Sequence, residues 1–141
     1  RGMIPGGDVA AEEYYNRAVL ASIDYWDEIN PSTDYEVTDL QREQFLKKVA
    51  YNGSLERILT QKYVALFWVG YEAYCDYRRT GYPLLNIGPG TSNDGILPTR
   101  LVYPVTTVKT NEEHVNEAIE RQGPDNMKTP VWWSKQAAAR N

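Results

Sequence analysis

The chain has 141 residues, of which 42% are hydrophobic and 24% charged, and its formal net charge at pH 7 is −4. This length and balance favour one folded domain over a disordered segment. The weak acidic charge lacks the basic footprint of a nucleic-acid-binding protein, and no window approaches the roughly 20 apolar residues that a membrane span needs.

The chain has one cysteine and one histidine, which limits the chemistry that it can support. Cys75 has no partner for an internal disulfide, and its apolar surroundings predict a small buried side chain. His114 would have to serve any histidine-based metal site or Ser-His-Asp triad, yet it lies beside Glu112 and Glu113 in a charged stretch. We therefore predict no catalytic residue, no metal site and no cofactor.

The first predicted helix covers about residues 8–28. Tyr15, Val19 and Trp26 recur at helical spacing, and Asp8 is a good N-cap residue. Asn30-Pro31 ends this helix, because proline disfavours helical geometry in the residue before it.

A second, shorter helix follows a polar turn. Thr38 with Gln41 fits a capping box, and the helix is expected to run to about Tyr51. Its predicted apolar face consists of Leu40, Phe45 and Val49.

The third predicted helix is long and contains the most informative stretch of the chain. Ser54 can cap it, and Gly81 followed by Pro83 marks its end, so it would be about 40 Å long at 1.5 Å per residue. No charged residue occurs between Tyr63 and Tyr71. A helix that is apolar on every face must be covered on every side.

Few other segments of the chain look able to provide that cover. We therefore expect residues 1–141 to belong to a larger helical body whose remainder supplies the missing walls. If these residues stand alone, several of five side chains should be exposed to solvent: Leu66, Phe67, Trp68, Val69 and Tyr71.

The next segments are less regular. Residues 84–99 are rich in turn-forming dipeptides and predict a long loop. Residues 100–108 look extended, although Pro104 excludes a central strand. A second capping box, Thr110 with Glu113, predicts a helix that runs to about Gln122.

An irregular tail ends in Trp132 and Trp133. A buried aromatic side chain removes roughly 150–250 Å² from water, so such residues can hold an irregular segment in place. We expect at least one of the two to be a packing anchor rather than a ligand platform.

Two groups of polar residues are candidates for function. Asp24, Asp27 and Glu28 could supply the paired carboxylates of a glycosidase, but a solvated helix face is the preferred interpretation. The Asn93-Asp94-Gly95 turn could offer hydrogen bonds to sugar hydroxyls or oxygens to a cation. Tyr35, in the polar turn after Pro31, could present a ring to a sugar. Asn93, Asp94 and Tyr35 are the predicted ligand-binding residues, although a plain turn also explains the first two.

Four motifs follow one another in a specific order: RRTGYP at 78–83, LPTRLVYP at 97–104, TNEEHVNEAI at 110–119 and QGPDNMKTPVWW at 122–133. In content and order they closely resemble the C-terminal region of the SusD/RagB family, within which the chain looks nearest the SusD-like group. The start of the chain, residues 1–26, resembles the segment that leads into this region, and the likeness covers most of residues 1–135.

The resemblance implies an all-α, tetratricopeptide-like helical SusD-type fold with long irregular loops, of which residues 1–141 would be the C-terminal portion. The chain starts at Arg1 without a signal peptide, and the N-terminal portion with its lipidated cysteine is expected to lie outside it. The matched motif residues look like fold markers. They are Arg78, Arg79, Gly81, Tyr82, Pro83, Arg100, Tyr103, Pro104, Trp132 and Trp133.

The function that the resemblance implies is binding, not catalysis. Members of the family are lipid-anchored proteins on the surface of the outer membrane of Bacteroidetes-type bacteria. They capture oligosaccharides or peptides for a SusC-type TonB-dependent transporter. The implied partners are therefore that transporter, the nutrient ligand and the remainder of the same protein. The alternative is a helical scaffold that binds only protein.

Overall fold

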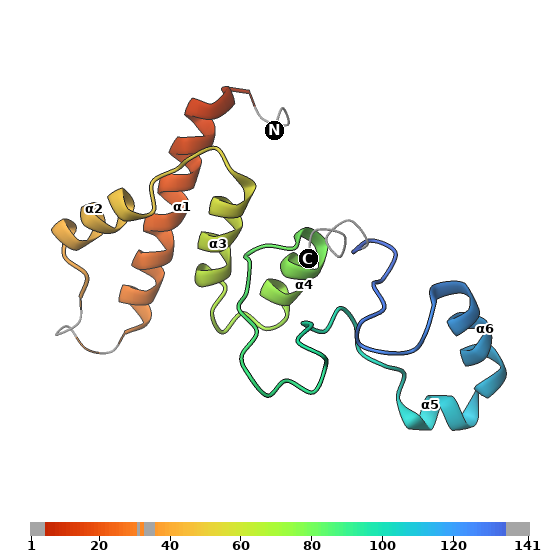
Figure 1. Ribbon diagram of the computed structural model, residues 1–141. Helices are drawn as coiled ribbons and strands as arrows, with labels where there is room; N and C mark the ends of the chain where they lie inside the picture. The colour runs from red at the N-terminus through yellow and green to blue at the C-terminus, as the bar shows by residue number, and fades with distance from the viewer. Residues whose placement is uncertain (1–4, 31, 33–35, 135–141) are drawn as a thin grey trace. The chain divides into compact units, whose positions relative to one another are not determined.

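The computed structural model describes residues 5–30, 32 and 36–134 (Figure 1). Within these residues the chain forms six helices and no strand, which confirms the all-α class. The chain divides into two compact units, Arg1–Ala73 and Tyr74–Asn141. None of the helices in the described part is long and apolar enough to cross a membrane.

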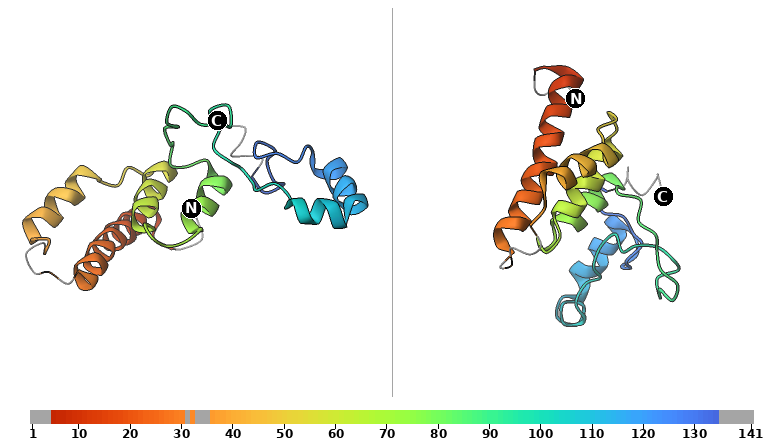
Figure 2. Two further views of the ribbon diagram at one scale, coloured as in Figure 1. Left: turned by 90° about the horizontal axis from the view of Figure 1, so that it is seen from below. Right: turned by 90° about the vertical axis from the view of Figure 1, so that its left-hand side faces the viewer.

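The first unit is built on α1 (Gly7–Ile29). The helices α2 (Asp39–Lys48) and α3 (Leu55–Ala65) both pack against it (Figures 1 and 2). The helix α1 is therefore the common partner of the other two.

The core of the first unit is small. Tyr15 and Val19 of α1 and Val49 at the end of α2 are buried together, with Leu46 and Tyr51 packed around them. The rings of Tyr15 and Tyr51 are 5.5 Å apart, and the Tyr15 hydroxyl donates a hydrogen bond to the Val49 carbonyl. The predicted inward positions Tyr15, Val19 and Val49 are therefore confirmed.

The two predicted caps of the first unit are present. Gln41 N–H donates to Thr38 Oγ1 at 3.3 Å, and Thr38 N–H donates to Gln41 Oε1 at 2.8 Å, which completes the capping box. Ser54 Oγ accepts a hydrogen bond from Arg57 N–H at 3.1 Å. At α1, by contrast, the predicted Asp8 cap is wrong: Gly6 is the N-cap, and Asp8 lies within the first turn.

The expectation of one long third helix is wrong. It ends at Ala65 and resumes as α4 (Glu72–Thr80), with a turn between them. Trp68 (φ 66°) and Gly70 (φ 47°) both adopt the left-handed conformation, which a continuing helix does not tolerate. For a tryptophan this conformation costs about 1–3 kcal/mol and persists only where the surroundings hold it.

The predicted end of α4 is confirmed. Gly81 has φ 76°, and its N–H donates to the Tyr77 carbonyl at 2.7 Å, as in a glycine-terminated helix. Cys75, expected to be buried, is exposed.

The second unit continues through an irregular segment into α5 (Val105–Thr110) and α6 (Glu112–Gln122), which pack against each other (Figure 2). The expectation of an extended segment fails from Val105 onwards, because Pro104, with φ −59°, precedes a helix instead of interrupting a strand.

The predicted second capping box is also wrong. Asn111 is the N-cap of α6 and makes no side-chain capping bond. The Thr110 hydroxyl donates instead to the Thr106 carbonyl at 2.9 Å, within the last turn of α5.

Two arginines of the sequence motifs hold the irregular parts of the second unit. The Arg78 guanidinium lies over the Tyr74 ring at 4.4 Å and the Trp133 ring at 4.6 Å, and its Nη1 donates to the Thr99 carbonyl at 3.2 Å. Trp133 is half-buried, so it is the predicted anchor of the tail, whereas Trp132 is 82% exposed.

Arg100 is the second of these arginines and is only 7% exposed. Its Nη2 donates to Asp125 Oδ1 at 2.8 Å, and the same carboxylate accepts the Tyr103 N–H. The guanidinium also lies 5.0 Å from the centre of the Tyr103 ring. These contacts support the interpretation of Arg78 and Arg100 as fold markers.

Candidate functional site

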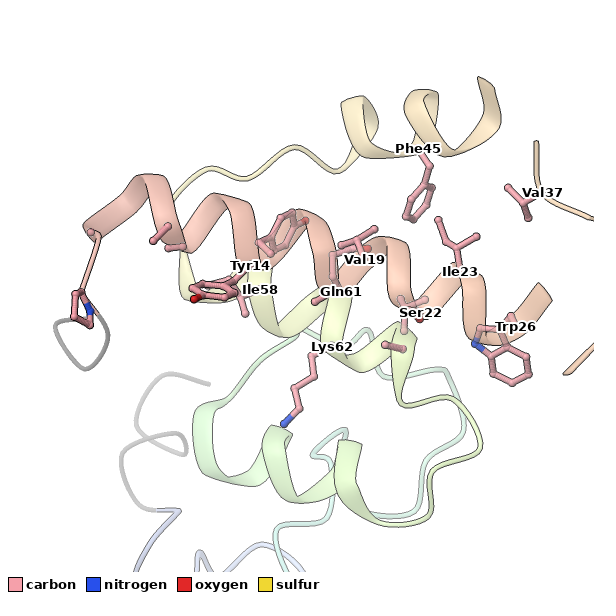
Figure 3. A pocket seen from close by; sticks show the side chains of 18 residues that line it. Tyr14, Val19, Ser22, Ile23, Trp26, Val37, Phe45, Ile58, Gln61 and Lys62 are labelled. Atoms are coloured by element: carbon pink, nitrogen blue, oxygen red, sulfur yellow. The ribbon is translucent and has the colours of Figure 1, made fainter. Parts of the chain in front are cut away.

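An apolar groove of about 680 Å³ follows α1 in the first unit (Figure 3). It is lined along α1 from Gly7 to Trp26, and on α3 from Ile58 to Ala65. Phe45 of α2 points toward α1 near Ile23 and closes part of one side. The groove therefore lies where α1 has more apolar surface than α2 and α3 cover.

Polar groups are sparse along this groove. Among the described residues that line it, Lys62 brings an amine, Gln61 an amide, and Tyr14, Tyr15 and Ser22 a hydroxyl each. Burial raises the pKa of the Tyr15 hydroxyl, while the positive charge of Arg57 acts in the opposite direction. Tyr15 therefore remains a neutral donor to the Val49 carbonyl.

A second apolar feature adjoins the groove. We call residues 63–71, the end of α3 and the turn after it, the apolar belt. Phe67, Trp68 and Tyr71 are 61%, 84% and 82% exposed. The belt meets the groove at Trp26, whose ring centre lies 6.2 Å from that of Phe67.

The predicted exposure of this stretch is confirmed. Of the five side chains named from the sequence, only Leu66 is half-buried, while the other four are exposed. The sequence did not reveal the groove itself. The one sequence feature that could have indicated the groove was the broad apolar surface of residues 8–28, which has few other segments to cover it.

Two of the three carboxylates considered for catalysis, Asp24 and Asp27, belong to an ion-pair network. Arg42 of α2 binds both Asp24 and Asp27 of α1, and its Nε donates to the Val37 carbonyl at 3.2 Å. Asp24 is largely exposed, but the Asp27 side chain is only 16% exposed, so the expected solvated face is wrong for Asp27. Sequence reasoning missed Arg42 because it lies 15 and 18 residues away in the chain. Across the described ranges no group of three His, Cys, Asp or Glu side chains could hold a metal ion.

The predicted ligand-binding residues lie in different places. Asn93 and Asp94 share one turn in the second unit, closed by hydrogen bonds from Asn93 Nδ2 to the Ile96 carbonyl at 2.8 Å and from Ile96 N–H to the Asn93 carbonyl at 3.0 Å. Asp94 forms an ion pair with Lys128. Tyr35 lies outside the described residues. The structure brings Asn93 and Asp94 together, and a ligand role for them stays a prediction.

These features define a helical protein module with uncovered apolar surface, and comparison identifies its class. The profile of the SusD-like family, described as starch-binding and associating with the outer membrane, matches residues 1–104. The chain therefore belongs to this family, which confirms the resemblance seen in the motifs.

Several solved structures are similar to this chain, and two of the three described here are SusD homologues. One from Bacteroides fragilis superposes with a TM-score of 0.79 at 34% identity, covering 96% of this chain and 32% of that one. A chitin-binding protein has a TM-score of 0.73 at 28% identity, over 89% of this chain and 28% of its own. A chitin-binding SusD homologue from Flavobacterium johnsoniae has a TM-score of 0.64 at 28% identity. The match covers 88% of this chain and 31% of that one.

The chain thus spans about a third of the length of these relatives. No curated protein matches it.

Proposed function

We propose that this chain is part of an outer-membrane protein that binds oligosaccharides for uptake and does not alter them chemically. The observation that carries the proposal is the similarity to two chitin-binding structures, each 28% identical over 88% or more of the chain. The family description, starch-binding and associating with the outer membrane, supports the same class of ligand. Peptides remain the alternative ligand.

Residues 1–141 form the C-terminal portion of that protein in this proposal. A lipid on a cysteine outside these residues anchors it to the cell surface, and it delivers its ligand to a SusC-type TonB-dependent transporter. The length of the relatives, about three times that of this chain, supports the proposed larger protein.

Titration calorimetry of the full-length protein tests the ligand class. Chito-oligosaccharides, malto-oligosaccharides and short peptides are compared, and we expect at least one glycan series to bind. After overnight incubation with the bound glycan, we expect no new reducing ends. Absence of binding to every glycan overturns the proposed ligand class, and release of shorter glycans overturns the proposal of a binding protein.

The predicted ligand residues are tested in the same protein. Asp94→Asn removes one charge from the turn and should weaken glycan binding about tenfold or more, because a hydrogen bond to a charged group contributes ~1.5–3 kcal/mol. Glu120 is exposed on α6, so Glu120→Gln removes one charge away from the turn and is the matched control. Equal affinities of the two variants would remove Asp94 from the site.

A protein-binding scaffold is the second candidate function. The groove and the apolar belt favour it, since they offer contact area without the polar groups that position a sugar. Co-purification of the tagged full-length protein with a transporter barrel, together with no affinity for any glycan or peptide, would support this second function over the first.

A further inference from the structure

We propose that Asn52-Gly53, in the link between α2 and α3, is a site of spontaneous modification, at which the Asn52 side chain loses its amide as ammonia. An aspartyl or isoaspartyl residue takes its place. The reaction needs no enzyme, because the reacting groups are neighbours in the chain and water is the only co-reactant. The inference concerns the polypeptide itself and is independent of the proposed ligand.

The link presents both reacting residues to solvent. Asn52 and Gly53 are exposed, and Gly53 has φ 74°, a conformation that glycine adopts without a steric penalty. A Cβ built at Gly53 would meet no heavy atom of more distant residues within 4 Å. No other part of the described chain therefore crowds the backbone at which the reaction takes place.

The side-chain oxygen of Asn52 is held by two donors. Its Oδ1 accepts the Ser54 N–H at 3.0 Å and the Ser54 hydroxyl at 2.8 Å. When a nucleophile attacks Asn52 Cγ, negative charge develops on this oxygen, and donors already in place stabilise it, as in an oxyanion hole. Ser54 Oγ also caps α3 by accepting the Arg57 N–H at 3.1 Å, so the helix keeps these donors in position.

The reaction passes through a cyclic imide. The Gly53 nitrogen attacks Asn52 Cγ and gives its proton to solvent, and the side-chain NH2 leaves with a proton as ammonia. Water then opens the succinimide ring, adding its OH to a carbonyl carbon and its other proton to the nitrogen. Opening at the side-chain carbonyl carbon leaves aspartate. Opening at the main-chain carbonyl carbon leaves isoaspartate, whose main chain runs through Cβ and Cγ.

The two products differ in their effect on α3. An aspartate at position 52 keeps an oxygen for Ser54, and its negative charge lies favourably near the N-terminus of α3. Isoaspartate instead adds a methylene to the main chain, which displaces the acceptor from Ser54. The isoaspartyl form should therefore be less stable than the unmodified protein, whereas Asn52→Asp should retain the stability.

Peptide mapping of the folded full-length protein by mass spectrometry tests the proposal after incubation for several weeks in mildly alkaline buffer. Asn126 is the internal control, because it is also exposed and its Oδ1 also accepts the N–H two residues further on, at 2.9 Å, but Met127 follows it instead of glycine. We expect Asn52 to convert about tenfold or more faster than Asn126, which corresponds to ~1.4 kcal/mol or more in activation free energy.

Three variants separate the contributions. Gly53→Ala places a methyl group beside the attacking nitrogen and should slow the conversion about tenfold or more. Asn52→Gln leaves Gly53 in place and should abolish the conversion, because its longer side chain does not form the succinimide; it serves if Gly53→Ala disturbs folding. Ser54→Ala removes the hydroxyl donor and should slow the conversion severalfold.

An intact Asn52, or equal conversion of Asn52 and Asn126, overturns the proposal. Conversion in Ser54→Ala at the rate of the unmodified sequence overturns the role of the hydroxyl. The isoaspartyl form is separated by chromatography and unfolded in urea beside Asn52→Asp. Equal midpoints of the two would overturn the proposed effect on α3.

Discussion

Tyr15 combines two roles in the core of the first unit. Its ring packs with Tyr51, and its hydroxyl donates to the Val49 carbonyl, which ties the middle of α1 to the end of α2. The hydroxyl is buried, so the pKa of Tyr15 is raised above its ordinary value of 10.0. The folded state therefore favours the neutral form more strongly than the unfolded state does.

Tyr15→Phe should lower the free energy of unfolding at pH 7 by about 0.5–1.5 kcal/mol, the usual contribution of one hydrogen bond. In the native protein the contribution of Tyr15 is present below pH 10 and is lost as the pH rises through the raised pKa. The difference in the free energy of unfolding between the native protein and Tyr15→Phe should therefore shrink above pH 10. Urea unfolding at several pH values measures it.

Tyr14→Phe is the control for this experiment, since Tyr14 is its neighbour and is 52% exposed. Parallel stability curves for the protein and Tyr15→Phe between pH 7 and 11 would contradict the assignment.

Arg42 is the second residue on which the first unit depends. It pairs with two carboxylates of α1, and its side chain is 19% exposed. Arg42→Met should lower the free energy of unfolding by about 2–4 kcal/mol, because it leaves the partly buried Asp27 carboxylate without its ion-pair partner. Thermal and urea unfolding of the full-length protein measure the change.

Lys47→Met provides the matched control. The Lys47–Glu43 pair also lies on α2, but both side chains are more than half exposed, at 72% and 62%. Exposed pairs of this kind contribute less than about 1 kcal/mol. If the two variants lose the same stability, the Arg42 network has no structural role of the kind described.

Among the elements, α3 begins at a local signal in the sequence but ends without one that periodicity reveals. Its N-terminus is capped by Ser54, and its C-terminus is followed by a turn containing the left-handed Trp68 and Gly70. This turn separates α3 from α4 and displays the aromatic side chains of the apolar belt.

Ser54→Ala should destabilise the protein by about 1 kcal/mol, the usual cost of an N-cap lost from a helix. Ser54→Gly should lower the stability by only a few tenths of a kcal/mol, because glycine is tolerated at N-caps. Differential scanning calorimetry compares the two variants. An equal loss in both would show that the Ser54 hydroxyl does not cap α3.

For the whole molecule, the exposed groove and belt dominate the expected behaviour. If a helix of the same polypeptide covers them, Phe67→Glu in the full-length protein buries a charge and should cost about 3 kcal/mol or more. Val9→Glu, at a position that is 81% exposed and outside the groove, should change the stability by less than about 0.5 kcal/mol. Urea unfolding tests this, and similar values for both variants would contradict a covered belt.

The features that the sequence by itself determined are those with local causes. The caps at Thr38 and Ser54 and the stop at Gly81 depend on hydrogen bonds between residues at most four positions apart, so their patterns can be recognised in the sequence. The all-α class was implied by the resemblance, and the six helices of the described residues confirm it. The ordered motifs identified the family, which the match over residues 1–104 confirms.

Only the tertiary structure decided the features that depend on contacts between distant residues. Periodicity alone does not place the left-handed turn at Trp68 and Gly70 inside an apolar run, so it predicted one helix instead of two. The partners of Arg42 and Arg100 lie 15 to 25 residues away, and spacing does not reveal them. The groove exists because of what α2 and α3 leave uncovered on α1. That is a property of packing, which no single segment of sequence contains.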